Sequence, residues 1–387
     1  MRASGILLHI SSLPSPHGIG TMGAAAKDFV DFLVKAGQAY WQILPVCPTS
    51  YGDSPYQSFS TFAGNPYLID LEELIENGWL TEEECENTDW GGSKSYVDYE
   101  KMYQGRFPLL RKAYHNSHIA ENAEFIAFCE ENDWWLSDYA LFMAIKDSQG
   151  GASFLEWDAP LKLREPEAIR RCRHELSDEI CFWQFLQYLF AKQWQALKAY
   201  ANGKGISIIG DIPIYVALDS AEVWVYPDLF ELDENLVPKA VAGCPPDAFS
   251  PTGQLWGNPL YNWDRHREYG FNWWIDRIKS ATSLYDVVRI DHFRGFEGYY
   301  SIPYGDKTAE NGQWLKGPGI ELFNAVKNEL GDLPIIAEDL GFLTEDVHKL
   351  LRDSGFPGMK VLEFAFDPRE ESNYLPYTYN SNSVVYV

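Results

Sequence analysis

The sequence predicts an α/β fold, and within that class a (β/α)8 TIM barrel, on three observations. Short apolar or β-branched runs recur along the chain, amphipathic helical patterns lie between several of them, and acidic residues close three of the runs. Near-continuous apolar strands that alternate with helices are typical of a parallel sheet covered on both faces. A doubly wound sheet is less well supported, because it would carry a Gly-rich fingerprint after its first strand and the sequence has none.

Seven such runs predict seven parallel strands. They span residues 5–10, 40–46, 205–211, 285–291, 333–339, 358–364 and 383–387. Between the first two, residues 24–37 predict a helix, since Phe29, Phe32 and Leu33 recur at i, i+3 and i+4. A closed barrel needs an eighth strand, and an open one would leave two edges unpaired. The seventh run coincides with the end of the sequence, so by this count the eighth strand is missing from this chain. Either the count of strands is one too low, or the chain is part of a longer protein.

The stretch from 70 to 200 interrupts this rhythm with helical sequence rich in Glu and Trp. We therefore expect residues 1–69 and 201–387 to form the catalytic barrel, incomplete at its C-terminal end, and residues 70–200 to form a mostly helical insertion after the second strand. A separate helical domain would leave the same pattern. The sequence contains no internal repeat and no low-complexity tract.

Composition excludes several classes of protein. With 31 Lys and Arg against 56 Asp and Glu, the net charge of −25 argues against a nucleic-acid partner, because no basic run offsets it. The N-terminal apolar run is too short for a secretory signal, and no stretch is long enough to span a membrane. The six cysteines are scattered without metal-ligand spacing, so we expect reduced thiols, a cytoplasmic protein and no metal.

Three carboxylates close neighbouring runs: Asp211, Asp291 and Glu338. In a barrel these positions meet at one rim. Arg289 and Asp291 point to the same face of their strand, and a guanidinium favours the ionised carboxylate that a nucleophile needs. An ordinary ion pair at a strand end would give the same pattern. Glu338 follows an apolar run, where desolvation would keep its carboxyl group protonated and suited to general-acid work.

Two aromatic stretches rich in Gly and Pro, residues 48–66 and 242–263, are too long for simple connections. Their Tyr, Trp, Asn and Gln side chains offer flat faces for sugar rings and amides for hydroxyl groups. Loops that only pack against their own barrel are the alternative. Together with three carboxylates at one rim, they indicate cleavage of a glycosidic bond.

The loops and strand ends described above contain five motifs, which occur along the chain in this order: GDSPYQSFSTFAGNP, GDIPIYV, CPPDAFSPTGQLWGNPLYNW, VVRIDHFRGF and IIAEDLG. In this combination the chain closely resembles the 4-alpha-glucanotransferases (amylomaltases or disproportionating enzymes), glycoside hydrolase family 77 within the alpha-amylase clan. The resemblance implies a (β/α)8 barrel that acts on malto-oligosaccharides and other alpha-1,4-glucans by a retaining double displacement. It also implies that the enzyme uses no metal and no organic cofactor.

The resemblance assigns roles to matching positions. Asp291 would be the nucleophile, Glu338 the general acid and base, and Arg289 the residue that orients Asp291. His292 and Asp211 would line the donor sugar site. Further sugar contacts would come from Ser54, Tyr56, Asp247, Trp256 and Asn258.

The sequence also departs from the family pattern. Members carry a third catalytic acid in a His-Asp-Asn motif just after the seventh strand, and this chain stops where that motif would begin. We therefore expect the chain as given to bind glucan weakly and to have little or no activity. Two other functions fit the same residues, an alpha-amylase-type glucan hydrolase and a non-catalytic glucan-binding protein. The sequence carries no signal for an oligomeric state.

Overall fold

The computed structural model describes residues 2–387 except 51, 94, 248–249, 342 and 367–373. The chain divides into two compact units. The first comprises Met1–Ile208 and Asp219–Val225, and the second comprises Ile209–Leu218 and Tyr226–Val387. Strand β3 (Ser207–Ile212) begins in the first unit and ends in the second.

The regular elements of the first unit are mostly helices. Its strands are β1 (Gly5–Leu7) and β2 (Tyr40–Gln42), and its helices are α1 (Ala24–Lys35), α2 (Leu71–Glu76), α3 (Glu82–Glu86), α4 (Tyr99–Ser117), α5 (Ala123–Glu131), α6 (Asp133–Ser148), α7 (Ala159–Lys162), α8 (Pro166–Glu175), α9 (Ser177–Gly203) and α10 (Ala221–Val225).

The second unit contains the remaining strands and helices. Its strands after β3 are β4 (Ala240–Cys244), β5 (Gln254–Pro259), β6 (Val287–Ile290), β7 (Gly298–Pro303), β8 (Gln313–Lys316), β9 (Ile335–Ala337), β10 (Gly358–Val361) and β11 (Ser383–Tyr386), and its helices are α11 (Trp263–Glu268), α12 (Asn272–Leu284), α13 (Ile320–Leu330) and α14 (Glu345–Ser354).

In the first unit, β1 and β2 pair in parallel, and Ser207 at the start of β3 donates its N–H to the Ala39 carbonyl at 2.9 Å. The long helix α9 packs against α6, α5 and α4 and buries a row of aromatic side chains that includes Phe182 and Trp194. Every regular element in the described part of residues 70–200 is helical, as the sequence predicts. The boundaries of the barrel and its insertion remain predictions.

One helix prediction needs correction. Helix α1 forms over most of the predicted stretch, and Leu33 is buried, but Phe32 is 51% exposed and Phe29 is only half-buried. The buried face runs instead through Ala26 and Val30 together with Leu33. The spacing of large apolar residues therefore located the helix but misplaced its inner face.

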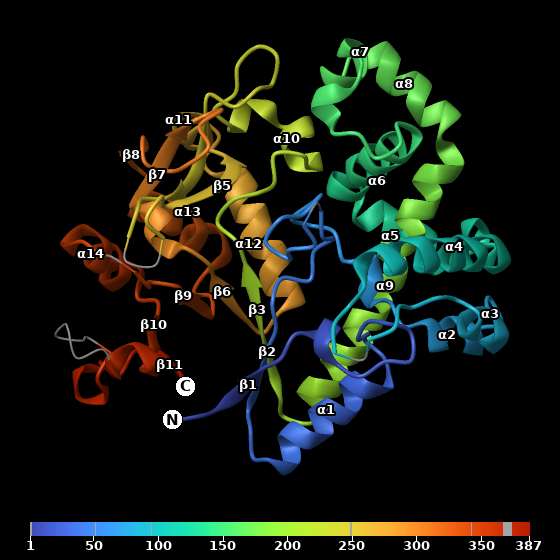
Figure 1. Ribbon diagram of the computed structural model, residues 1–387, viewed down its shortest axis with the longest axis horizontal. Helices are drawn as coiled ribbons and strands as arrows, with labels where there is room; N and C mark the ends of the chain where they lie inside the picture. Colours follow the sequence, from blue (N-terminus) through green and yellow to red (C-terminus); the bar gives the residue numbers. More distant parts are fainter. Residues whose placement is uncertain (1, 51, 94, 248–249, 342, 367–373) are drawn as a thin grey trace. The chain divides into compact units, whose positions relative to one another are not determined.

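In the second unit, β3, β6, β9, β10 and β11 pair in this order, and each pairing is parallel. Helix α12 precedes β6, α13 precedes β9 and α14 precedes β10, so strands and helices alternate along the chain (Figure 1). Each of the seven predicted apolar runs overlaps an observed strand, and β3 extends one residue beyond its run, to Ile212. Strand β10 is shorter than the predicted run 358–364, because residues Leu362–Phe366 form a 3-10 helix.

A second sheet was not predicted. Strands β5, β4, β7 and β8 form an antiparallel sheet in this order, around buried residues Val241, Tyr300, Ile302 and Ala309. The interpretation of residues 242–263 as one long loop was therefore wrong, since β5 and the end of β4 form a hairpin within it. The Gly, Pro and Asn content of the stretch hid the strands. Positions 248 and 249 of this stretch lie outside the described residues.

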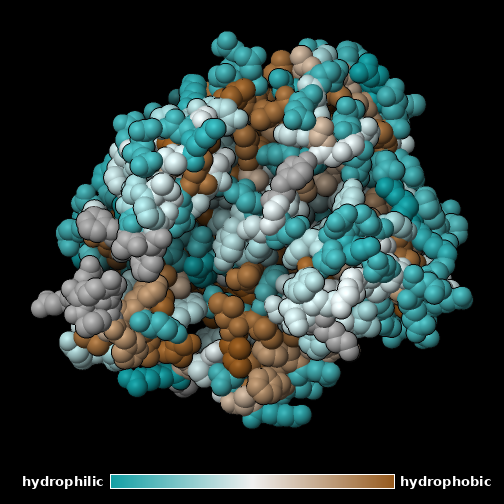
Figure 2. All heavy atoms as spheres, viewed as in Figure 1, coloured by the Kyte–Doolittle hydropathy of each residue, from teal (hydrophilic) through white to brown (hydrophobic). Residues whose placement is uncertain are grey.

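The face drawn in Figure 2 is largely hydrophilic, with smaller hydrophobic areas between the polar side chains. This agrees with a net charge of −25. Within the described chain, no helix combines the length and the apolar composition that crossing a bilayer would need.

Candidate active site

The second unit brings the three predicted carboxylates to the ends of adjacent strands. Asp211 lies in β3, Asp291 directly follows β6 and Glu338 directly follows β9. The backbone ladder continues beyond the strands, because Asp291 donates its N–H to the Ile212 carbonyl at 2.9 Å and Glu338 donates to the Ile290 carbonyl at 3.0 Å. These bonds hold the backbones of both residues at the carboxyl ends of the parallel strands.

Arg289 connects two of these carboxylates. Its Nη1 donates to Oδ1 and Oδ2 of Asp211, both at 2.7 Å, and its Nη2 lies 2.9 Å from Oδ1 of Asp291. Asp211 faces Arg289 directly in the register of β3 and β6, and only 2% of its side chain is exposed. The prediction that Arg289 and Asp291 share a face of the strand is confirmed.

Charge and burial act against each other in this cluster. Burial lowers the pKa of Arg289, but the neighbouring Asp211 and Asp291 outweigh it and raise that pKa above its usual range. The pKa of Asp291 is raised from its usual value, because burial outweighs the charge and hydrogen bond of Arg289, which act in the opposite direction. The Asp291 side chain is 31% exposed, so its carboxylate is accessible to a ligand.

Glu338 has a different environment. Its Oε2 accepts a hydrogen bond from the His292 N–H at 2.8 Å, and its Oε1 accepts one from the Leu340 N–H at 2.8 Å. Burial, with the negative charge of Asp291 as the second cause, raises the pKa of Glu338 from 4.5 to about 7. A carboxyl group with this pKa can both donate and accept a proton near neutral pH.

His292 joins the carboxylates to an aromatic side chain. Its backbone has φ 53° and ψ 47°, a left-handed conformation that few residues other than glycine adopt. The ring meets Trp256 edge to face, with centroids 4.8 Å apart. Burial lowers the pKa of His292 to about 3, so the ring is neutral, and its Nε2 has no hydrogen-bond partner within the described residues. Gly295 packs closely here, since an added Cβ would lie 2.7 Å from the Ile214 side chain and 3.0 Å from the His292 ring, so both would have to shift.

The other predicted contacts in this unit have varied surroundings. Trp256 is half-buried and donates from Nε1 to Gln254 Oε1 at 3.0 Å. Asn258 is buried and donates from Nδ2 to the Val216 carbonyl at 2.8 Å, so it also fastens the segment after β3. Asp247 is exposed and accepts from the Ser250 N–H at 2.7 Å. Sugar contacts by these three residues remain predictions.

Ser54 and Tyr56 belong to the first unit. Both are half-buried, and Tyr56 donates its N–H to Ser54 Oγ at 3.2 Å. Position 51 of the same loop lies outside the described residues. The roles predicted for Ser54 and Tyr56 therefore rest on the family resemblance.

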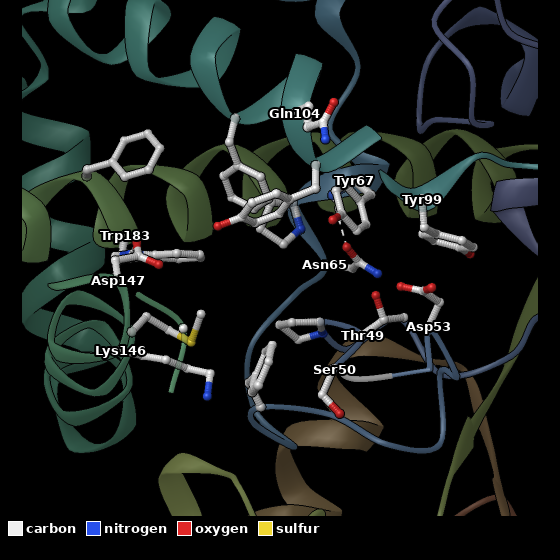
Figure 3. Close-up of a pocket in the computed structure, with 18 of the residues that line it drawn as sticks. Thr49, Ser50, Asp53, Asn65, Tyr67, Tyr99, Gln104, Lys146, Asp147 and Trp183 are labelled. Atoms are coloured by element: carbon white, nitrogen blue, oxygen red, sulfur yellow. Dashed lines mark hydrogen bonds between the residues drawn. The ribbon is translucent and has the colours of Figure 1, made fainter. Parts of the chain in front are cut away.

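The first unit also contains a cavity of about 1120 Å³, which the sequence did not reveal. It is lined by the loop that begins at Pro48 and by side chains of α4, α6 and α9. In Figure 3, Trp183 and Asp147 lie side by side at one end of this cavity, away from Asp53 and Tyr99. Trp183 donates from Nε1 to Asp147 Oδ2 at 2.9 Å, and burial raises the pKa of Asp147 to about 6.

Sequence reasoning missed one residue that contacts the cluster of Asp211, Arg289, Asp291 and Glu338, and one buried arginine shortly after Asp291 in the chain. Met359 in β10 accepts a hydrogen bond from Arg289 Nε, with 3.3 Å between nitrogen and sulfur. Arg294 is buried with its guanidinium 3.9 Å from the centre of the Trp314 ring. A methionine in an apolar strand has no sequence signal beyond core packing. Among the described residues, no group of three or more His, Cys, Asp and Glu side chains could hold a metal ion.

Comparison with known proteins agrees with this geometry. The family model described as 4-alpha-glucanotransferase matches residues 8–387. The 4-alpha-glucanotransferase of Clostridium butyricum is 53% identical over 380 residues, which cover 98% of this chain and 78% of that protein. That of Thermus thermophilus is 50% identical over 390 residues, covering 100% of this chain and 77% of the relative.

Solved structures show the same fold. The amylomaltase from Streptococcus agalactiae, solved in complex with acarbose, has a TM-score of 0.97 and 49% identity, and the match covers 100% of this chain and 78% of that one. The amylomaltase from Corynebacterium glutamicum, at 20% identity, shares the fold with a TM-score of 0.79, over 99% of this chain and 54% of that one. The predicted α/β fold of TIM-barrel type is confirmed. On its motifs, its fold and its relatives, the chain belongs to the 4-alpha-glucanotransferase family.

Proposed function

We propose that the enzyme that carries this sequence transfers segments of alpha-1,4-glucan between malto-oligosaccharides at the carboxylate cluster of the second unit, formed by Asp211, Arg289, Asp291 and Glu338. One observation carries the proposal: two carboxyl groups at adjacent strand ends have contrasting environments. Burial raises the pKa of both, but Asp291 is ion-paired with the guanidinium of Arg289, which opposes the rise, whereas Glu338 accepts hydrogen bonds from two backbone N–H groups and its pKa is raised to about 7. Such a contrast separates a nucleophile from a general acid. An amylomaltase with 49% identity has been solved with acarbose, which supports a glucan as the ligand.

The first half of the reaction forms a covalent intermediate. A carboxylate oxygen of Asp291 attacks the anomeric carbon of the donor glucan while Glu338 gives its proton to the glycosidic oxygen. The bond between that carbon and that oxygen breaks, and the shortened glucan leaves with the proton. Arg289 favours the ionised form of the Asp291 carboxylate and holds it in position, through the ion pair at 2.9 Å.

The second half transfers the glycosyl group. Glu338, now ionised, takes the proton from the 4-hydroxyl group of an acceptor glucan, whose oxygen displaces Asp291 from the anomeric carbon. The two inversions retain the configuration of the sugar. Transfer rather than hydrolysis requires that the acceptor displace water from the site. We propose that the stretch 242–263 excludes water and contacts the acceptor, since Trp256 on it packs against His292.

The remaining assignments extend this proposal. We assign His292 and Asp211 to the donor sugar site, and Ser54, Tyr56, Asp247, Trp256 and Asn258 to sugar contacts along the glucan. Substrates of this kind derive from starch and maltodextrin. A cytoplasmic location is supported by the six cysteines, which are scattered along the sequence without the spacing of a disulfide framework.

Product analysis tests the reaction. Incubation of the enzyme that carries this sequence with maltotriose should give glucose together with chains longer than maltotriose, whereas the 387 residues alone should give little or none of either. A hydrolase would give only shorter sugars, and a glucan-binding protein would leave maltotriose unchanged, so either result contradicts the proposal.

A second experiment tests the two roles. With α-maltosyl fluoride as donor, E338Q should accumulate a maltosyl ester on Asp291, because fluoride leaves without a general acid while the second step lacks its base. Peptide mass mapping would locate the ester. D291N should form none, whereas D264N, at an exposed carboxylate paired with Arg267, should behave as the unmodified protein. An ester on any other residue would refute Asp291 as the nucleophile.

A further inference from the structure

Arg289 has three hydrogen-bonding edges, and each meets a different residue. Nη1 faces Asp211, Nη2 faces Asp291, and Nε donates to the thioether sulfur of Met359 at 3.3 Å. The guanidinium is planar and its donors are fixed in one plane, so three partners on three sides determine both its position and its rotation. The Arg289 side chain is 11% exposed, so water has little access to replace a lost partner.

Met359 is held in place by its own backbone. It is 5% exposed and lies in β10, where it pairs with Val384 of β11. Its N–H donates to Oδ1 of Asp339 at 2.6 Å, and Asp339 directly follows Glu338. The approach requires a glycine before it, because a Cβ at Gly358 would lie 2.7 Å from the Asp339 carboxylate. Met359 is therefore tied through its backbone to the segment of Glu338 and through its sulfur to the partner of Asp291.

The chemistry of sulfur suits this position. A thioether is a neutral, weak acceptor, so it can satisfy Nε without drawing the positive charge of Arg289 away from the carboxylates. A carboxylate in its place would compete with Asp291 for the guanidinium. An aliphatic side chain would leave a buried N–H without a partner, which is costly.

We propose that Met359 is a positioning residue of the transferase site, which holds Arg289 in the orientation that pairs it with Asp291. This inference rests on the proposed function of Asp291 only for its effect on turnover. The contact itself is a property of the folded protein, and it can be tested without substrate.

The direct test is hydrogen exchange at Nε of Arg289, followed by NMR and assigned by loss of the signal in R289K. M359L keeps an apolar side chain of similar volume but removes the acceptor, so exchange should become at least about tenfold faster. M359Q supplies an amide oxygen and should restore slow exchange. The control M102L changes a methionine that is 0% exposed in α4 of the first unit, and it should leave the Arg289 signal unchanged.

The functional test is the pH profile of kcat/KM with maltotriose. M359L should lower kcat/KM about fivefold and move its acidic limb to higher pH, because a less constrained Arg289 stabilises the Asp291 anion less. M359Q should restore the limb. A purely structural role would lower thermal stability in M359L and M359Q without moving the limb in either.

Two results would overturn the proposal. One is an exchange rate at Arg289 Nε in M359L that equals the slow rate of the unmodified protein. The other is that M359L and M359Q change the exchange rate and the acidic limb of kcat/KM by the same amount. Failure of the proposed function has a different signature, since D291N would then retain transfer while the exchange experiment would still report the contact of Met359.

Discussion

Glu338→Gln should stabilise the protein in a pH-dependent way while it abolishes transfer. The native pKa of Glu338 is raised from 4.5 to about 7, first by burial and then by the charge of Asp291. Between these two pH values the native state holds a proton that the unfolded state has released. Stability conferred at low pH is therefore lost as the pH rises from 4.5 to about 7, and the loss is complete above that range.

The size of the effect follows from the same pKa values. One pH unit corresponds to about 1.4 kcal/mol, so the interval amounts to about 3 kcal/mol. A neutral glutamine does not incur this cost. It does present an NH₂ group to one of two N–H donors, those of His292 and Leu340, but that penalty is the same at every pH. The informative quantity is thus the change with pH of the difference between the two proteins.

The assay is urea denaturation of both proteins at a series of pH values from 4 to 8. The free energy of unfolding of E338Q, relative to the unmodified protein, should rise by about 3 kcal/mol across this range. In the background D291N the rise should be smaller, because the second cause of the shift is removed. A difference that stays constant with pH would show that Glu338 titrates normally, and the assignment as general acid would lose its physical basis.

Three further predictions concern both units. The value of kcat/KM for maltotriose should fall about tenfold per pH unit above about pH 7, because Glu338 loses its proton there. Glucose release at fixed ionic strength measures this, and a profile that stays flat to pH 9 would contradict it. R289K should lower kcat/KM about 100-fold or more, because one ammonium group cannot reach Asp211, Asp291 and Met359 together. Steady-state kinetics measure this, and a loss of less than threefold would show that the three contacts of Arg289 are not needed for turnover. K146M should destabilise the protein by about 3–5 kcal/mol in urea denaturation, since it leaves the Asp219 carboxylate, at 14% exposure, without the cation of the pair and, among the described residues, with only the Phe154 N–H to donate to it. K146M/D219L should recover part of that loss, and a double variant as unstable as K146M would contradict the reasoning.

The strands illustrate what periodicity can predict. Runs such as 205–211 and 285–291 are apolar because both faces of a parallel strand are covered, and each overlaps an observed strand. The antiparallel strands β4 and β5 were not predicted, because Gly, Pro and Asn interrupt their apolar sequence. Strand β4 pairs with β5 on one side and, on the other, with β7, which lies far away in the sequence. Phe32 shows a similar limit, since spacing does not say which side of a helix a core will cover.

The site divides in the same way. The residue types and their positions at strand ends identified Asp291, Glu338 and Arg289 from the sequence alone, because alternation along one strand and an apolar run before a carboxyl group are local properties. The family followed from motifs whose order the sequence displays directly. At Asp247 and Asn258 the sequence does not distinguish a side chain that contacts sugar from one that stabilises the local backbone. In the structure both side chains form hydrogen bonds with backbone groups.

What the tertiary structure decided is how these groups act on one another. Asp211, Arg289 and Met359 are distant in sequence, and they meet only because β3, β6, β9 and β10 lie side by side in register. Burial depends on the whole packed unit, and it is the first cause of the raised pKa of Glu338 and of the lowered pKa of His292. The sequence by itself thus determined which chemical groups are present and on which elements, whereas distances and desolvation, which set their protonation and pairing, exist only in the folded chain.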